Sequence, residues 1–188
     1  MMKCSVELPV EYLEYSDRFD YDFVIASTYV SHPEYKKWYL DRKDTERFQK
    51  YSILDNGAFE TGESLPSKEY LEIANELRPS ILVLPDVAFN PIKTLERSLE
   101  MVNFIRSNAN EYARAVPPSI KLMGVIQANG SRDAAIMLGH AYRNAGVDYI
   151  GIPYISKLDR YQLITECFPN DKIHILGCPT LPEAVSLC

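Results

Sequence analysis

The fold of this 188-residue chain is decided by a short apolar run near its middle, Ile81-Leu82-Val83-Leu84, followed at once by Pro85-Asp86. The run is continuous and does not alternate with polar residues, which is typical of a parallel strand covered on both faces. Similar runs occur at residues 23–26, 52–54, 120–126, 149–152 and 173–176. Successive runs start about 24 to 39 residues apart, which is the length of one strand-plus-helix unit.

Helical patterns fill the spaces between these runs, because apolar residues recur there with the 3.6-residue period of an amphipathic helix. The expected helices begin at Ser67, cover residues 95–105, extend from Ser131 to a left-handed Gly146, and cover residues 158–167. The charged and aromatic segment 34–50 is expected to be a helical or loop excursion after the first strand.

Alternating strands and helices predict an α/β fold with a parallel sheet, either a barrel or an open sheet. A TIM-type (β/α) barrel uses roughly 31 residues per unit, so this chain corresponds to about six units, one for each apolar run. We therefore expect a single, incomplete barrel domain over residues 1–188. The capping box Thr180-x-x-Glu183 predicts a further helix near the end. Either the chain is cut short or a partner covers the open edge.

The charge, the N-terminal residues and the cysteine spacing limit the class of protein to which this chain can belong. A net charge of -6 and a pI near 5.1 argue against a broad basic surface for nucleic acid, though not against a local basic patch. The N-terminal residues lack the apolar segment of a signal peptide, and no stretch reaches the roughly 20 apolar residues of a membrane helix. Cys4, Cys167, Cys178 and Cys188 lie far apart. We expect reduced thiols in a cytoplasmic protein, with no metal site and no cofactor.

Candidate site residues follow the predicted strands, where parallel α/β folds place their working groups. Asp55 follows the second run, Asp86 the third and Gln127 the fourth, and Gly151 lies in the fifth. Two carboxylates and an amide are therefore expected at one rim, beside glycine backbone that a ligand can approach closely.

Each of these residues also has a purely structural interpretation. Asn56-Gly57 is a signal for a hairpin turn, in which case Asp55 only starts that turn. Asp86 could cap the next helix. Gln127 could satisfy backbone groups of a loop.

A dense basic cluster follows the first predicted strand and consists of Lys36-Lys37, Arg42-Lys43 and Arg47. Because neutralising the phosphate backbone dominates nucleic-acid affinity, we predict that Lys36 and Lys37 contact phosphates. A solvated helix face is the alternative. The adjacent Trp38 and its neighbouring tyrosines fit both packing and base stacking, and His174, inside an apolar run, is expected to be a hydrogen-bonded core residue.

The order of these motifs resembles the tRNA-guanine transglycosylases. Residues 55–59, Asp-Asn-Gly-Ala-Phe, match the family's Asp-Ser-Gly-Gly-Phe/Tyr element. Gly124-Val125-Ile126-Gln127 matches its Gly-Ile-Val-Gln element, and His174-Ile175-Leu176-Gly177 matches its Tyr/His-Leu-Met-Gly element. The short spacing and the wording Leu-Asp-Asn-Gly-Ala-Phe are closer to the phage and bacterial branch associated with 7-deazaguanine modification of DNA. The resemblance covers about residues 20 to 182.

The resemblance implies an enzyme that replaces guanine in DNA or tRNA with a 7-deazaguanine base through a covalent sugar–enzyme intermediate. Asp86 would accept hydrogen bonds from N1 and N2 of the base, while the Gln127 amide and the Gly151 backbone N–H would donate to O6. Asp55 would be the catalytic residue that assists proton transfer. Such a site rejects bases that lack these polar groups, and the target base has to leave its stack.

Two features of the family have no counterpart here. Its nucleophilic aspartate and its zinc site both follow the Leu-Gly element, and the sequence ends at Cys188 before either. Three explanations stay open: residues beyond 188 are lost, Asp55 acts as the nucleophile, or the protein binds the base as a non-catalytic subunit of a homo- or hetero-oligomer. An unrelated TIM-barrel enzyme acting on small sugars or sugar phosphates is a further hypothesis, although no Gly-rich phosphate loop supports it.

Overall fold

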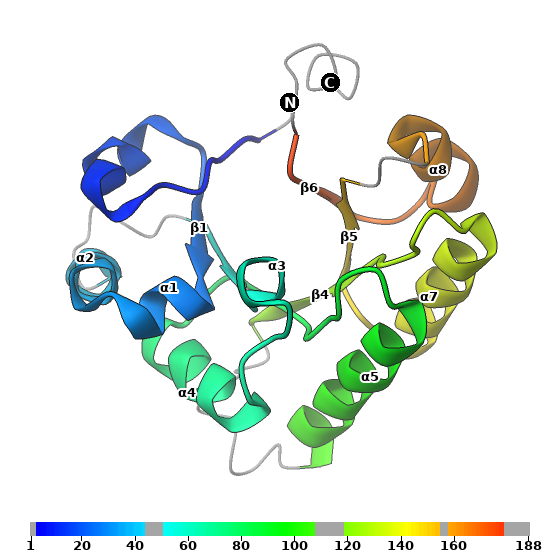
Figure 1. Cartoon of the computed structure of the whole chain (residues 1–188), viewed down its shortest axis with the longest axis horizontal. Coiled ribbons are helices and arrows are strands. Elements are labelled where there is room, and N and C mark those ends of the chain that lie inside the picture. Colours follow the sequence, from blue (N-terminus) through cyan, green and yellow to red (C-terminus); the bar gives the residue numbers. More distant parts are fainter. Residues whose placement is uncertain (1–2, 44–50, 108–118, 155–157, 179–188) are drawn as a thin grey trace.

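Six parallel strands form one sheet in the computed structural model of this protein, which describes residues 3–43, 51–107, 119–154 and 158–178. Each strand pairs with the next one along the chain. The strands are β1 (Asp22–Ile25), β2 (Ser52–Asp55), β3 (Ile81–Val83), β4 (Lys121–Val125), β5 (Tyr149–Pro153) and β6 (Ile173–Leu176). The sheet curls into a half-barrel with helices on its outside (Figure 1). The α/β class and all six predicted strands are confirmed.

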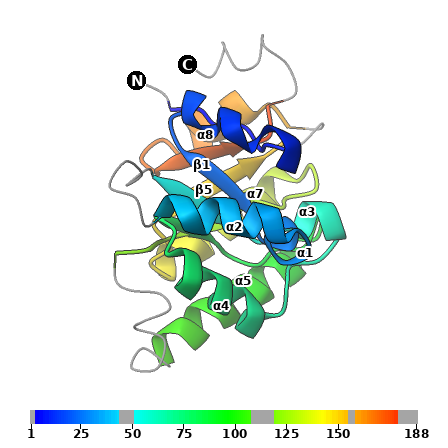
Figure 2. The ribbon, with the colours of Figure 1, turned by 90° about the vertical axis from the view of Figure 1, so that its left-hand side faces the viewer.

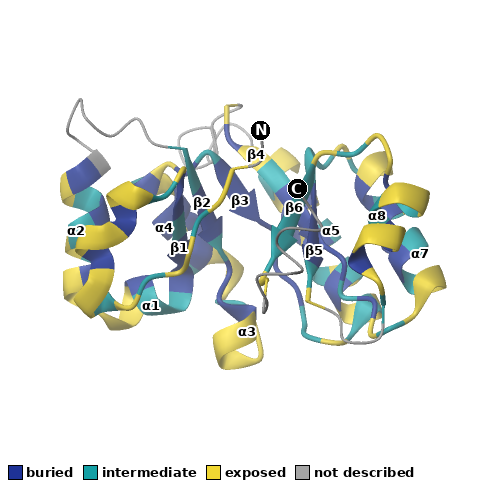
Figure 3. Cartoon of the chain, turned by 90° about the horizontal axis from the view of Figure 1, so that it is seen from above, coloured by how far each residue is buried: buried dark blue, intermediate teal, exposed yellow. Residues whose placement is uncertain are grey.

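The helices cover the outer face of the curled sheet (Figures 1 and 2), except for the short helix Ala58–Thr61, which projects beyond the strand ends (Figure 3). They are the 3₁₀ helix η1 (Val10–Arg18), α1 (Ala26–Ser31), α2 (Pro33–Lys43), α3 (Ala58–Thr61), α4 (Ser67–Leu77), α5 (Pro91–Ser107), α7 (Arg132–Asn144) and α8 (Arg160–Cys167). Ser131 caps α7 as predicted, since its side chain accepts a hydrogen bond from the Ala134 N–H at 3.2 Å. Gly146 follows α7 in the left-handed conformation, with φ 63°. Ser67 is the first residue of α4 and makes no cap, because Pro66 occupies that position.

The excursion after β1 is helical, and its tyrosines are packing residues. Tyr29 on α1 and Tyr35 and Tyr39 on α2 are buried in the core. The Tyr35 hydroxyl oxygen accepts a hydrogen bond from the Ile25 N–H at 3.1 Å, which ties α2 to the end of β1. The rest of the predicted excursion, including Arg47, lies outside the described residues, as does the predicted capping box at residues 180–183.

The inner face of the half-barrel is filled by alternate strand residues and the residues just before two strands. These are Tyr21, Phe23, Tyr51, Ile53, Ile81, Val83, Met123, Val125, Tyr149 and Leu176. The curl brings β1 against β6: the Phe23 and His174 rings stack with centroids 6.1 Å apart, and the Tyr21 ring lies 5.8 Å from His174. Burial lowers the pKa of His174 to about 4, so the imidazole is neutral in this packing role.

The strand ends define two different sides of the half-barrel. Residues 3–9 run past β1, where the Asp20 N–H donates to the Cys4 carbonyl at 3.0 Å and the Ser5 hydroxyl donates to the Tyr21 carbonyl at 2.6 Å. Because the strands are parallel, all their C-terminal ends lie on the opposite side, where the exposed helix α3 projects (Figure 3). Among the described helices, none is long and apolar enough to cross a bilayer.

Candidate functional site

Asp86 is the centre of a hydrogen-bonded group of side chains at the C-terminal ends of β2, β3 and β4. Its Oδ1 accepts from Asn56 Nδ2 at 2.7 Å, and its Oδ2 accepts from Gln127 Nε2 at 2.6 Å. The Asp86 side chain is buried, with 4% of the residue exposed. It does not cap α5, because Asn90 does so by accepting from the Lys93 N–H at 3.0 Å. The structure therefore brings Asp86 and Gln127 together, as their positions after neighbouring strands predict.

Asn56 belongs to this group, although the sequence analysis selected only its neighbour Asp55. Its Nδ2 also donates to the Leu84 carbonyl at 2.9 Å, and its Oδ1 accepts from the Ala58 N–H at 2.8 Å. Its hydrogen-bonding capacity is thus used, and its orientation is fixed. Its place directly after a strand, inside the matched motif, is the signal that could have identified it.

The Asn56-Gly57 dipeptide forms no hairpin, because β2 is parallel to both β1 and β3. Gly57 has φ 75° and leads the chain into α3. A Cβ atom at Gly57 would lie 2.8 Å from Ser27 Oγ. Both the left-handed backbone and the close approach of Ser27 therefore require glycine at this turn.

Gln127 satisfies a backbone group of a loop, as its structural interpretation predicts, and it also contacts Asp86; its predicted contact with a base stays a prediction. Its Oε1 accepts a hydrogen bond from the Phe89 N–H at 3.2 Å, while its Nε2 donates to Asp86. These two bonds determine which way the amide faces. In the described part of the chain, no hydrogen bond uses the second N–H of Nε2.

Asp55 is half-buried at the end of β2 and differs from Asp86 in its surroundings. Its Oδ2 accepts a hydrogen bond from the Gly57 N–H at 2.9 Å. This bond is the one expected if Asp55 starts a turn. Burial raises the pKa of Asp55 to about 7, the Gly57 N–H opposes this shift, and the negative charges of Asp86, Glu60 and Glu7 add to it. Near neutral pH Asp55 is therefore able both to give and to take a proton.

The pKa of Asp86 is also raised by burial, and the hydrogen bonds from Gln127 and Asn56 oppose that shift. The Asp86 carboxylate accepts these two amide bonds and one bond from its own backbone N–H, so of its roughly four acceptor positions one is left. The Asp86–Gln127 pair thus offers a ligand one hydrogen-bond acceptor beside one donor. Because the charges acting on Asp55 are those of other carboxylates, the site favours ligands that bring donor groups and disfavours anions.

Gly151 lies inside β5, where it pairs with Val125 of β4 and His174 of β6. Its carbonyl accepts from the Ile126 N–H at 2.9 Å. Since the N–H and C=O of one strand residue point to the same neighbouring strand, the Gly151 N–H is directed at β4. The predicted donation to a base therefore requires this pairing to open, and it stays a prediction.

Lys36 and Lys37 lie on α2, which belongs to the outer helical layer (Figure 1). Lys36 Nζ forms an ion pair with Glu76 Oε2 at 2.8 Å, and Lys37 pairs with Asp41 on the next turn. Both ammonium groups thus have carboxylate partners, and their contact with phosphates stays a prediction. The neighbouring Arg42 is buried and pairs with Asp17 at 2.6 Å.

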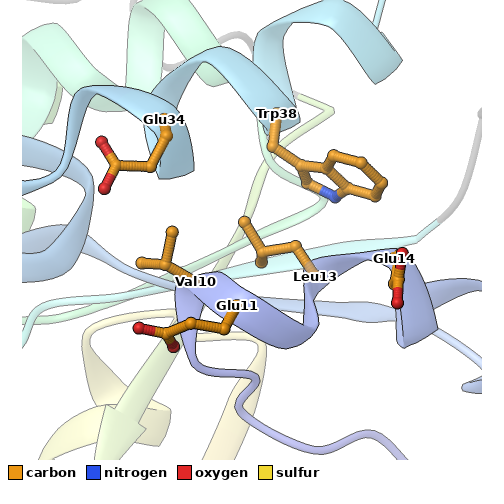
Figure 4. Close-up of a pocket in the computed structure, with 6 residues that line it drawn as sticks. All are labelled: Val10, Glu11, Leu13, Glu14, Glu34 and Trp38. Atoms are coloured by element: carbon orange, nitrogen blue, oxygen red, sulfur yellow. The ribbon is translucent and has the colours of Figure 1, made fainter.

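A separate hollow of about 220 Å³ lies between η1 and α2 (Figure 4). Its lining consists of Val10, Glu11, Leu13, Glu14, Glu34 and Trp38. Trp38 packs against the core and lies under the Arg42 guanidinium, 5.2 Å from the ring centroid. For Trp38, packing is therefore the interpretation that the structure supports. Three carboxylates around this hollow make it unfavourable for a phosphate backbone.

In the described ranges, no group of three or more His, Cys, Asp or Glu side chains is placed to hold a metal ion. No model of a known protein family matches the chain. No curated protein matches it either.

Proposed function

We propose that this protein binds a guanine-type base at the Asp86–Gln127 pair and exchanges guanine in DNA or tRNA for a 7-deazaguanine base. The observation that carries the proposal is the acceptor beside a donor at the ends of β3 and β4. A 6-oxopurine presents the complementary pair, an N1–H beside the O6 carbonyl. Asp86 accepts from N1–H and the second N–H of Gln127 Nε2 donates to O6, whereas adenine offers the reverse pattern and would leave both protein groups unpaired.

Asp55 supplies proton transfer in this proposal. As the glycosidic C1′–N9 bond breaks, its electron pair leaves with guanine, the sugar is left as an oxocarbenium ion at C1′, and the protonated Asp55 gives its proton to the departing base. The incoming 7-deazaguanine then loses its N9 proton to Asp55, and its N9 forms the new bond to C1′. A pKa of about 7 supports this exchange of roles, because both protonation states are populated at neutral pH.

The curled sheet with its outer helices is consistent with an incomplete TIM-type barrel, in which the C-terminal ends of the strands carry the site. Cys4, Cys167 and Cys178 form no disulfide among the described residues, in keeping with a cytoplasmic enzyme. The surrounding carboxylates disfavour a sugar phosphate, so an unrelated sugar-phosphate enzyme is the weaker candidate.

A non-catalytic base-binding subunit is the second candidate, and the Asp86 network favours it to the same degree. Asn56, Asp86 and Gln127 are able to recognise a base edge without taking part in bond breaking. The two candidates share the binding step and differ in whether a base is incorporated into nucleic acid.

Calorimetric titration of the full chain with guanine, 7-deazaguanine and adenine tests the shared step. We expect both oxopurines to bind on the order of 100-fold more tightly than adenine. Asp86→Asn should weaken guanine binding by about 10- to 100-fold, the range for a lost charge-assisted hydrogen bond. Asp171→Asn is the matched control, because Asp171 pairs with Arg143 near the start of β6. Equal binding of adenine and guanine would contradict the proposal.

Incorporation of labelled guanine into DNA or tRNA then separates the two candidates. Incorporation that is lost in Asp55→Asn supports the exchange enzyme. Guanine binding without incorporation by the full-length protein supports the non-catalytic subunit.

A further inference from the structure

Phe89, in the loop between β3 and α5, combines two unfavourable features. Its backbone is in the left-handed region, with φ 59°, and 64% of the residue is exposed. A left-handed conformation is disfavoured for a residue with a bulky side chain, and strain of this kind occurs mainly at functional positions. An exposed phenylalanine also gains little from burial. The folded state alone thus gives no reason for phenylalanine at this position.

The loop that carries Phe89 is anchored on both sides. The Thr94 hydroxyl of α5 accepts from the Val87 N–H and donates to the Val87 carbonyl, each at 3.0 Å. The Ser98 hydroxyl donates to the Pro85 carbonyl at 2.9 Å. On the other side, the Phe89 N–H donates to Gln127. Since Thr94 and Ser98 are fully buried, these bonds hold the loop in one conformation against the strain at Phe89.

The bond to Gln127 also places Phe89 next to the predicted base-binding pair. The Phe89 backbone lies one hydrogen bond from the amide that donates to Asp86. Asp86 and Gln127 are able to bind the polar edge of a planar ring, but neither provides an apolar surface for its face. An exposed aromatic ring on the same loop as Asp86 provides such a surface.

We propose that Phe89 is a binding residue whose ring stacks on the face of a single planar purine base held by Asp86 and Gln127. This inference rests on the proposed function and adds to it the ligand's second point of recognition. Stacking on an aromatic side chain does not depend on the polar groups of the base. Phe89 therefore contributes affinity for any purine, while Asp86 and Gln127 contribute the preference for oxopurines.

Phe89→Ala, which keeps the backbone N–H, tests the ring directly. We expect guanine and 7-deazaguanine to bind about 5- to 100-fold more weakly by calorimetric titration, with the ratio of guanine to adenine affinity retained. Val30→Ala, at an exposed residue on α1, is the matched control and should bind like wild type. Phe89→Trp should bind at least as well as wild type, because its ring is larger.

Phe89→Gly adds a readout that a structural role would not produce. Glycine adopts φ 59° without strain, so we expect its thermal midpoint to rise by about 2–4 °C while base affinity falls as in Phe89→Ala. A falling midpoint, or unchanged affinity in both variants, would overturn the stacking proposal. If wild type binds no purine at all, the proposed function has failed, and that outcome is distinct from wild-type binding that survives removal of the ring.

Discussion

Asp55 and Asp86 are two carboxyl groups at one end of the sheet with different surroundings. Both oxygens of Asp86 accept amide hydrogen bonds, which favour its charged form. Asp55 is shifted mainly by burial, accepts only one backbone N–H and experiences the charges of three other carboxylates, so its neutral form is favoured. Different surroundings of this kind suggest separate roles for the two carboxyl groups. Asp86 suits recognition of a donor group, and Asp55 suits proton transfer.

The raised pKa of Asp55 makes stability depend on pH. Its pKa is about 7 in the folded protein and 3.8 ordinarily, so the folded state binds more protons between these values. The contribution of Asp55 to stability should therefore fall as pH rises from about 4 to 7. Asp55→Asn removes this loss and should be more stable than wild type at pH 8, on the order of 1–4 kcal/mol, with little difference below pH 4. Urea unfolding at a series of pH values measures this difference in the free energy of unfolding.

His174 provides the control for that experiment because its shift has the opposite sign. Burial lowers its pKa to about 4 from 6.5. Its contribution to stability is thus present above pH 6.5 and lost as pH falls toward 4. His174→Gln should remove that acid-side loss and leave the Asp55 effect in place. The same pH slope in wild type and Asp55→Asn would show that Asp55 is not shifted.

At the scale of elements, two glycines let aromatic rings approach the backbone. A Cβ at Gly139 of α7 would lie 2.2 Å from Phe168 Cε1, and one at Gly124 of β4 would lie 2.6 Å from the Tyr142 ring. The Tyr142 hydroxyl donates to the Val125 carbonyl at 3.1 Å. Close packing of α7 therefore supports the strand that presents Gln127.

Gly139→Ala should destabilise the protein by about 1–3 kcal/mol, the usual cost of overpacking a core. The loss should appear although alanine is the better helix former by about 1 kcal/mol, because the buried Phe168 ring has to move. Urea unfolding measures the change. Adding Phe168→Leu should recover part of the lost stability. A Gly139→Ala variant as stable as wild type would show that the Phe168 ring does not pack tightly against Gly139.

At the scale of the whole molecule, the candidate site and the outer helices occupy different places around the sheet. The Asp86 group lies at the C-terminal ends of the strands, the inner face is packed with apolar and aromatic residues, and the outer helices carry the ion pairs of Lys36 and Lys37. A nucleic acid that delivers a base to the strand ends would have to extend over α1 to reach α2. The predicted phosphate contacts therefore depend on how a nucleic acid lies across the whole molecule and not on the geometry of the Asp86 group.

Reversing Lys36 and Lys37 to Glu tests those contacts. If both neutralise phosphates, duplex binding should weaken and the slope of log affinity against log salt should fall by roughly 2. Lys172→Glu is the control, because Lys172 lies before β6, at the other end of the strands. Fluorescence anisotropy with labelled DNA and tRNA at several salt concentrations measures both quantities. Unchanged binding and slope would leave these lysines with only their ion pairs.

Much of the architecture follows from local pattern. The apolar runs became β1 to β6 because a continuous run of this length is stable when helices cover one face and the sheet curls over the other. The start of α7 follows from Ser131 and its end from Gly146, since capping depends on neighbouring residues. The same alternation of elements placed Asp55, Asp86 and Gln127 at the ends of adjacent parallel strands.

The sequence by itself thus determined the strands, most helices and the rim on which the candidate residues lie. Tertiary structure alone decided their partners: Asn56 and Gln127 hold Asp86, and Glu76 pairs with Lys36. It also decided that the Gly151 backbone pairs within the sheet. The physical reason is distance along the chain, because these contacts join residues about 25 to 40 positions apart. They form only when parallel strands align in register, which no local pattern specifies.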